Sequence, residues 1–346
     1  LFQAPTVAAL AASSAAEAGA GAEQGIVEGD VPLMPIQQWF FEQRFEGQEH
    51  WNQAILLQTA KRLRPEWLKH ATAQLIMHHD ALRLRFREGV NGWEQWDSAP
   101  QSSEAGAEPS FEAVDLSGLS EDDQKARIEG DAAALQSSLD LEKGPLFSVK
   151  YWDLGEGCGG RLMLVGHHLV VDGVSWRILL EDLQSIYGQL ESSRALPEGA
   201  GNVSLPPKTT SYREWAHRLV EYAHTPHLAS QLPYWRQVVD RPSSIPVDKR
   251  EGLVHAAWAQ NTENSARNVM VSLDQAETQD LLHRVPAAYH TEINDVLLAA
   301  LAQAFSAWTG EREMLVALEG HGREDLFAGV DLSRTVGWFT ALYPVR

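Results

Sequence analysis

Two adjacent histidines followed by an aspartate are the residues in this sequence whose types and spacing are best suited to chemistry. His167 and His168 end an apolar run, and Asp172 and Gly173 follow before an amphipathic stretch begins. An imidazole titrates near neutral pH, so a histidine at a strand end can exchange a proton in an adjoining cleft. Asp172 could orient a histidine, cap the next helix or pair with an arginine. Gly173 would let the chain turn sharply there.

Three other interpretations of this motif are open. His167, His168 and Asp172 are all metal-ligand types, but adjacent strand residues point to opposite faces, so at most one histidine shares the cleft with Asp172. We therefore expect no metal site at the motif. Two satisfied core histidines are the second possibility, which a double histidine before an Asp-Gly pair makes less attractive. A triad with Ser175 is the third, but no G-x-S-x-G turn surrounds that serine.

A second polar block, EGHGRED, occupies residues 319–325. Glu319 and Arg323 are four positions apart, with two glycines between them that would let the backbone approach a ligand closely. A solvated ion pair on a surface turn explains this pattern equally well. In a closed cleft, the carboxylate could instead serve as a second acid or base.

Apolar patterning predicts the elements that must position these two blocks. The run 161–167 is almost continuously apolar, which is typical of a strand covered on both faces. Trp176 and Trp308 fall on apolar helix stripes and are expected in the core, and His78 and His79 end a helix, where cationic side chains suit the dipole. Strands are expected at 51–59, 82–87, 92–96, 146–153, 161–167, 268–273 and 313–319, and helices at 65–79, 120–138, 174–190, 211–223, 227–239, 274–285 and 293–308.

A length of 346 residues favours two lobes of roughly 150 residues each. A Pro- and Gly-rich stretch without periodicity marks the expected connection between them. The predicted parts are a short helix at 1–12, a flexible Ala/Gly-rich linker at 13–30, a first lobe at 31–195, the connection at 196–210 and a second lobe at 211–346.

The composition excludes several classes of function. The formal net charge of −19 disfavours nucleic acid or an anionic membrane as the main partner. A single cysteine, Cys158, excludes an internal disulfide framework and suits a reducing compartment. The sequence has no run long enough to span a bilayer and starts without a secretory leader, so we expect a cytoplasmic protein.

The blocks, taken together, resemble an epimerization domain of a nonribosomal peptide synthetase, a member of the condensation-domain superfamily. The superfamily signature HHxxxDG occupies 167–173, and the epimerization branch extends it as DGVSWRIL at 172–179. Residues 1–12 resemble the last helix of a peptidyl carrier domain. The other matching blocks, in the order of the family, are 35–40 (PIQQWF), 290–300 (HTEINDVLLAA), 319–324 (EGHGRE) and 334–340 (RTVGWFT), followed by Tyr343-Pro344.

The resemblance implies a mixed α/β (α+β) fold of two chloramphenicol-acetyltransferase-like lobes in a V, with the site in the tunnel between them. Family members run on for roughly another hundred residues, so the second lobe is expected to be incomplete here. The implied reaction is inversion, L to D, at the α-carbon of an aminoacyl or peptidyl thioester. The domain would bind no cofactor or metal, because a thioester acidifies its own α-hydrogen. The substrate would arrive on the 4′-phosphopantetheine of an upstream carrier domain. A downstream condensation domain would take the product.

The resemblance also implies roles for individual residues. His168 and Glu319 match the catalytic histidine and glutamate of the family, and Asp172 would pair with Arg323 across the lobes. The site-supporting residues would be His167, Asp172, Gly173 and Arg323. An amide-forming condensation domain and a non-catalytic truncated module remain the alternatives.

Overall fold

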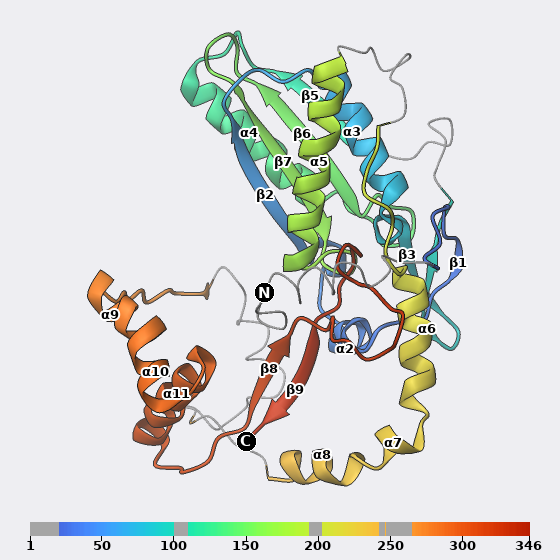
Figure 1. The fold of residues 1–346 in the computed structure, drawn as a ribbon. Helices are drawn as coiled ribbons and strands as arrows, with labels where there is room; N and C mark the ends of the chain where they lie inside the picture. The colour runs from blue at the N-terminus through green and yellow to red at the C-terminus, as the bar shows by residue number, and fades with distance from the viewer. Residues whose placement is uncertain (1–20, 100–109, 194–202, 242–245, 247–264) are drawn as a thin grey trace, which may run out of the picture. The chain divides into compact units, whose positions relative to one another are not determined.

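The structure is a computed structural model that describes residues 21–99, 110–193, 203–241, 246 and 265–346 (Figure 1). The chain separates into two compact units. The first contains the described residues up to Ala229 together with Glu319–Leu342, and the second contains Ser230–Leu318 with Tyr343–Arg346. The helix expected at 1–12, the start of the linker and part of the connection expected at 196–210 lie outside the described residues. The lobe boundaries themselves stay predictions.

The first unit is built on a four-stranded sheet with the order β2-β7-β6-β5. β7 is antiparallel to both of its neighbours, and β5 runs parallel to β6. The strands are β2 (Asn52–Thr59), β5 (Phe111–Asp115), β6 (Phe147–Asp153) and β7 (Gly160–His167). This confirms the strands expected at 51–59, 146–153 and 161–167, whereas the pattern did not predict β5.

Helices cover both faces of this sheet. Leu162 and Leu164 of β7 belong to the main core together with residues of α3 (Pro65–His78) and α5 (Gly173–Ser193). Met163 and Val165, which point the other way, belong to a smaller core beneath α4 (Glu121–Gln136). Figure 1 shows α3 and α5 on the near face of the sheet and α4 behind it. The expectation that 161–167 is covered on both faces is confirmed.

The first unit also contains a three-stranded sheet with the order β1-β4-β3. The turn expected at Asn91-Gly92 joins β3 (Leu84–Gly89) to β4 (Gly92–Asp97), and η2 (Asp80–Arg83) precedes β3. β1 (Gly29–Asp30) pairs with β4, and Val27 is only 2% exposed. An apolar anchor at Val27 and backbone pairing at Gly29–Asp30 thus hold these residues against the unit, and the linker bounds of 13–30 stay a prediction.

Four further helical elements belong to the first unit, and α8 (Leu232–Val239) belongs to the second. The four are α2 (Pro35–Gln43), the short η1 (Gln48–His50), α6 (Tyr212–Ala223) and α7 (Pro226–Ala229). The helix expected at 227–239 is divided into α7 and α8, and α8 has a proline in its first turn, where it needs no backbone donor. Among the described residues, none of the helices combines the length and apolar character needed to cross a bilayer.

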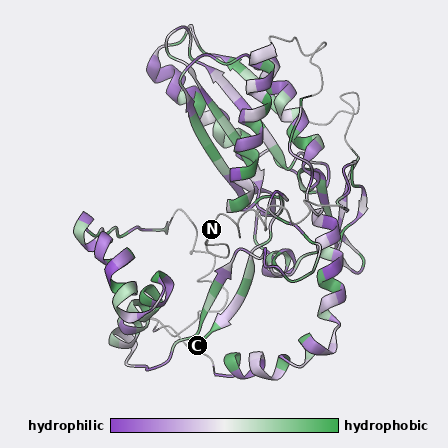
Figure 2. Ribbon diagram, viewed as in Figure 1, coloured by the Kyte–Doolittle hydropathy of each residue, from purple (hydrophilic) through white to green (hydrophobic). Residues whose placement is uncertain are grey.

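Besides α8, the second unit contains a helical run with a π-turn at its centre and one long helix. The run comprises α9 (Gln275–Gln279), the π-turn η6 (Asp280–Arg284) and α10 (Val285–Tyr289), and the long helix is α11 (Ile293–Thr309). Much of α11 is hydrophobic in Figure 2. Nevertheless Trp308 is 61% exposed, because no element of the described residues covers that stripe, so its expected core position is wrong.

The strand expected at 268–273 is also wrong. Val269, Met270 and Val271 are in no regular element, and each is exposed by 88% or more. Their β-branched and apolar side chains favour a strand, but a strand forms only against a neighbour, and the described part of the chain provides none there.

The segment that returns to the first unit brings the distant sequence blocks to the histidine motif. It begins within β8 (Val316–Gly320) and ends within β9 (Ala341–Val345), and these two strands form a small sheet. Between them, Val336, Trp338 and Phe339 are buried in the same core as α5. The blocks at 319–325 and 334–340 therefore lie in one unit with residues 167–173.

Candidate active site

His168 lies just beyond the end of β7 and is only partly buried. Its backbone N–H donates to the Trp51 carbonyl, which holds it beside the start of β2. The ring nitrogen Nδ1 lies 2.9 Å from the Val171 carbonyl oxygen, and Nε2 lies 2.9 Å from the amide nitrogen of Gln53. The Trp338 ring packs against the imidazole at 4.4 Å between centroids. His168 is therefore held on both edges and on one face.

His167 has entirely different surroundings, because its side chain is completely buried. Its Nε2–H donates to the Gln48 carbonyl at 2.8 Å, and its Nδ1 accepts from the Leu169 N–H at 3.1 Å. Burial lowers the pKa of His167 to about 4, and the hydrogen bond to Gln48 opposes that change only in part. His167 is consequently a neutral residue that ties the strand end to the loop.

The ion pair implied between Asp172 and Arg323 is present. Arg323 Nη2 lies 3.0 and 2.9 Å from the two carboxylate oxygens, and both side chains are more than nine-tenths buried. Burial lowers the pKa of Arg323, and the neighbouring carboxylate opposes this. Asp172 also caps α5, since its Oδ1 accepts from the Ser175 N–H at 2.7 Å. Asp172 therefore both pairs with an arginine and caps the helix, which are two of the three roles considered for it.

Ser175 is a structural cross-link between the two distant blocks. Its hydroxyl lies 2.8 Å from Asp172 Oδ1 and accepts from the Gly337 N–H at 3.0 Å. The Phe339 N–H also donates to Asp172, at 3.3 Å. Since the Ser175 side chain is fully buried within these contacts, it is not presented as a nucleophile.

Gly173 was expected to let the chain turn sharply after Asp172, and that expectation is wrong. This glycine is the first residue of α5 and has no positive φ, so no sharp turn requires it. A Cβ placed there would meet no heavy atom within 4 Å. The position is therefore open space at the helix start, directly after Asp172.

Glu319 is the candidate that the structure does not join to the others. It lies on β8 in an exposed position. Among the described residues, it forms no hydrogen bond or ion pair with His168. The structure thus brings His168, Asp172 and Arg323 together through the buried segment of Trp338, whereas the catalytic partnership of Glu319 stays a prediction.

Sequence reasoning missed the contact of Gln53 with His168 and the bond that Trp176 makes to Gln53. Gln53 lies on a strand and belongs to no motif, so only the pairing register brings it to the histidine. Trp176 is buried as expected, but its Nε1–H donates to Gln53 Oε1 at 2.7 Å. The signal that could have found this contact is its place in the DGVSW extension, where an indole brings a donor as well as apolar area.

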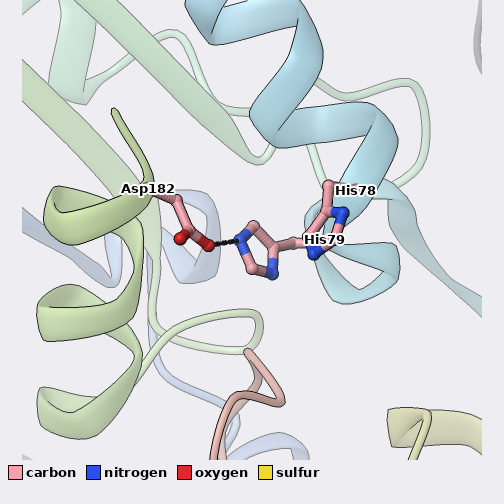
Figure 3. Close-up of side chains that lie close together, drawn as sticks. All are labelled: His78, His79 and Asp182. Atoms are coloured by element: carbon pink, nitrogen blue, oxygen red, sulfur yellow. Dashed lines mark hydrogen bonds and ion pairs between the residues drawn. The ribbon is translucent and has the colours of Figure 1, made fainter. Parts of the chain in front are cut away.

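A second cluster of ionisable residues lies where α3 ends near α5 (Figure 3). His78, His79 and Asp182 have ligand atoms within 4.8 Å of one another, and they are the one such group found in the described part of the chain. His79 Nε2 lies 2.9 Å from Asp182 Oδ2. Figure 3 shows His79, but not His78, directed at the carboxylate.

This cluster fits a charge network better than a metal site. Arg334 forms an ion pair with Asp182 Oδ1, so both carboxylate oxygens already have donors and a metal ion would meet a guanidinium. Burial and the neighbouring His79 lower the pKa of His78 to about 4. The adjoining cavity of about 20 Å³ has room for roughly one water molecule. The cluster joins α3 and α5 to the block at 334–340.

Comparison with protein families gives one match that covers most of the chain. The condensation-domain family matches residues 27–346. A linear gramicidin synthase of Brevibacillus parabrevis is 47% identical over 345 residues, all of this chain and 6% of that protein. Surfactin synthase subunit 1 of Bacillus subtilis (strain 168) is 40% identical over 348 residues, again all of this chain and 9% of that protein. The chain thus spans less than a tenth of these relatives.

Solved structures show the same fold. The epimerization domain from the third module of tyrocidine synthetase B is 36% identical, with a TM-score of 0.78 over 94% of this chain and 68% of that one. The first condensation domain of the calcium-dependent antibiotic synthetase is 20% identical, with a TM-score of 0.65 over 92% and 69% of the two chains. These likenesses confirm the mixed α/β fold. The sequence, its fold and its relatives agree that the chain belongs to the condensation-domain family of the nonribosomal peptide synthetases.

Proposed function

We propose that this chain belongs to an epimerization domain, which inverts the α-carbon of a carrier-bound aminoacyl or peptidyl thioester from L to D. The observation that carries the proposal is the VSW extension of the histidine motif, where two side chains have defined contacts. Ser175 holds the segment of Gly337, and Trp176 holds Gln53, which contacts His168.

The likeness to known structures supports the same branch. Identity to the epimerization domain of tyrocidine synthetase B is 36%, against 20% to the condensation domain of the calcium-dependent antibiotic synthetase. Within the family, the chain is thus more similar in sequence to the solved domain whose name states epimerization.

The proposed reaction needs two proton-transfer groups and no redox chemistry. One group breaks the Cα–H bond by accepting the proton, and the electron pair of that bond moves into the thioester carbonyl to give an enolate. A second group then donates a proton to the opposite face of the α-carbon, which re-forms the bond with inverted configuration. His168 is our candidate for the group that accepts the proton from the L-substrate, and Glu319 is our candidate for the group that donates a proton to the other face.

Activation by the thioester makes a bound cofactor unnecessary, since the thioester itself acidifies the α-hydrogen. The substrate would be presented on the 4′-phosphopantetheine of an upstream carrier domain, and a condensation domain downstream would accept the D-product. Both partners are part of the proposal, and the multidomain peptide synthetases among the relatives are consistent with them.

Condensation is the second candidate, favoured by the family model that matches residues 27–346. A condensation domain would use the same histidine to join the acyl group of one carrier to the amine on another. The two candidates differ in their products, so one experiment distinguishes them.

The test is solvent-deuterium incorporation at the α-carbon of an L-aminoacyl thioester loaded on a phosphopantetheine carrier. We expect deuterium uptake together with conversion to the D-epimer, and loss of both in His168→Ala. Glu319→Gln should permit exchange from one face while preventing inversion. His217→Ala and Glu221→Gln, two exposed positions on α6, serve as matched controls.

Two results would overturn the proposal. One is an absence of exchange with amide formation when a second loaded carrier is added, which would identify a condensation catalyst. The other is full activity in His168→Ala, which would remove the residue on which the mechanism depends.

A further inference from the structure

The hydrogen bonds around His168 determine which of its ring nitrogens carries the proton. The reasoning starts at Trp176, whose Nε1 lies 2.7 Å from Gln53 Oε1. An indole N–H can only donate, so the Gln53 atom that faces it must be the carbonyl oxygen. The amide nitrogen of Gln53 therefore faces His168, at 2.9 Å from Nε2.

The same reasoning continues into the imidazole ring. An amide N–H donates, so Nε2 of His168 must accept and must hold its lone pair there. On the other edge, Nδ1 lies 2.9 Å from the Val171 carbonyl oxygen, which only accepts, so Nδ1 carries the hydrogen. A neutral histidine side chain in water prefers the proton on Nε2. The contacts in this protein select the less common tautomer.

Gln53 and Trp176, which select the tautomer, are both held in place by regular secondary structure. Gln53 is opposite Gly166 in the β2–β7 pairing, two residues before His168, so its side chain lies on the same face as the imidazole. Trp176 is in the first turn of α5, is 7% exposed and packs its ring 6.3 Å from that of Phe147 on β6. Neither partner is a surface side chain with free choice of rotamer.

We propose that Gln53, fixed by Trp176, is a positioning residue that sets the Nδ1–H tautomer of His168 and so leaves Nε2 as the nitrogen that exchanges protons with the substrate. The inference rests on the proposed function, since it assigns a role to His168 in proton transfer. Gln53 acts through His168 and is not itself given a bond to make or break.

The arrangement has a consequence for turnover. A substrate α-hydrogen that approaches Nε2 has to displace the amide of Gln53. A side-chain amide can move aside in this way, whereas a backbone group could not. Once Nε2 holds a proton, both ring nitrogens donate, and Gln53 can meet that proton only by turning its amide. If the amide turned, its N–H group would face the indole N–H of Trp176, and two donors cannot form a hydrogen bond with each other. Gln53 therefore favours the ring form that existed before proton transfer.

The test reads the tautomer directly. Protein with ¹⁵N-labelled histidine rings is studied by ¹⁵N–¹H multiple-bond correlation near pH 8, and the His168 signals are assigned by their loss in His168→Gln. We expect Nδ1 to show the shift of a protonated nitrogen and Nε2 that of an unprotonated one. In Trp176→Phe the two shifts should move toward each other, because the amide is no longer fixed. In Gln53→Glu, which offers only acceptors, Nε2 should carry a proton.

Deuterium exchange on the carrier-bound thioester is the second readout. We expect Trp176→Phe to lower kcat about tenfold with KM unchanged, a part of the effect of one acid–base group. Trp152→Phe is the matched control, because it removes a buried indole donor that bonds to Asp131 instead. An Nε2–H tautomer in the wild-type protein, or an unaltered tautomer in both Gln53→Glu and Trp176→Phe, would overturn the inference. The expected tautomer without any exchange in the wild-type protein would overturn the proposed function instead.

Discussion

The imidazole of His167 is bonded only to backbone atoms, whereas that of His168 is bonded to one backbone carbonyl and one side-chain amide. The two rings also carry their proton on opposite nitrogens, Nε2 in His167 and Nδ1 in His168. Backbone partners at a strand end cannot move without unfolding, but a glutamine side chain can be displaced. The difference between a structural and a chemical histidine therefore lies in the kind of partner each one has, because both rings come from the same strand end.

The largest expected effect is that replacing His168 lowers activity, whereas replacing His167 lowers stability. His168→Ala should lower α-carbon exchange about 10³-fold, within the range of one acid–base group, while the free energy of unfolding changes by less than about 1 kcal/mol. His167→Ala should instead cost about 2 kcal/mol of stability, since it leaves buried backbone groups unpaired. Exchange rates and urea unfolding measure the two quantities. Equal losses of stability in the two variants would break the comparison.

The next effect concerns the ion pair that holds the segment against His168. Arg323→Met should destabilise the protein by about 3 kcal/mol, because it leaves the buried carboxylate of Asp172 without its partner. Arg218→Met is the control, since its pair with Glu214 is partly exposed and should contribute less than about 1 kcal/mol. Urea unfolding of both variants gives the values. Similar losses in the two would show that Asp172 does not depend on Arg323.

Acid should weaken the protein through His167. Its folded pKa of about 4 lies below the ordinary value of 6.5, so the unfolded state binds more protons between these values. The stability that the neutral His167 contributes is complete above pH 6.5 and is lost as the pH falls toward 4. The loss amounts to roughly 2 kcal/mol by pH 5. Urea unfolding at pH 7.5 and pH 5 measures it. His167→Gln, which does not titrate, should lose less stability over this interval, and an identical loss would contradict the assignment.

The smallest effect is expected at Gly173. Gly173→Ala should change the free energy of unfolding by less than about 1 kcal/mol, with a gain favoured, because the position is helical and a Cβ meets open space. Urea unfolding gives this value. Exchange of the carrier-bound thioester then shows whether the open space matters to a substrate. A loss of more than about 2 kcal/mol would mean that the glycine is required by the fold.

Much of the first unit could be predicted because its signals are local. The continuous apolar run at 161–167 predicted a strand, and the helical spacing of apolar residues in α5 predicted a helix. Both elements therefore followed from the sequence. The failures depended on partners elsewhere in the chain. Val269 to Val271 have the side chains of a strand but no neighbour in the described residues, and the stripe that includes Trp308 is left uncovered. Periodicity indicates a face and leaves open what covers it.

The same limit applies to the site. The ion pair of Asp172 with Arg323 followed from recognising two motifs, since no local pattern connects residues 151 positions apart. Gln53 could not be found in this way, because it reaches His168 through strand register and carries no motif. His79 was expected to suit a helix dipole, yet it is buried against Asp182. A charged partner on another helix decides its role.

The separation of 151 residues between Asp172 and Arg323 also has a consequence during synthesis. A ribosome adding about 5 to 20 residues per second reaches the arginine roughly 8 to 30 seconds after the aspartate. During that interval the emerging sheet can form, but the carboxylate at the start of α5 lacks its counter-charge and stays costly to bury. The strand end that carries the histidines must therefore remain open to water until the later segment arrives, and a chaperone that recognises exposed apolar chain has that interval in which to bind it.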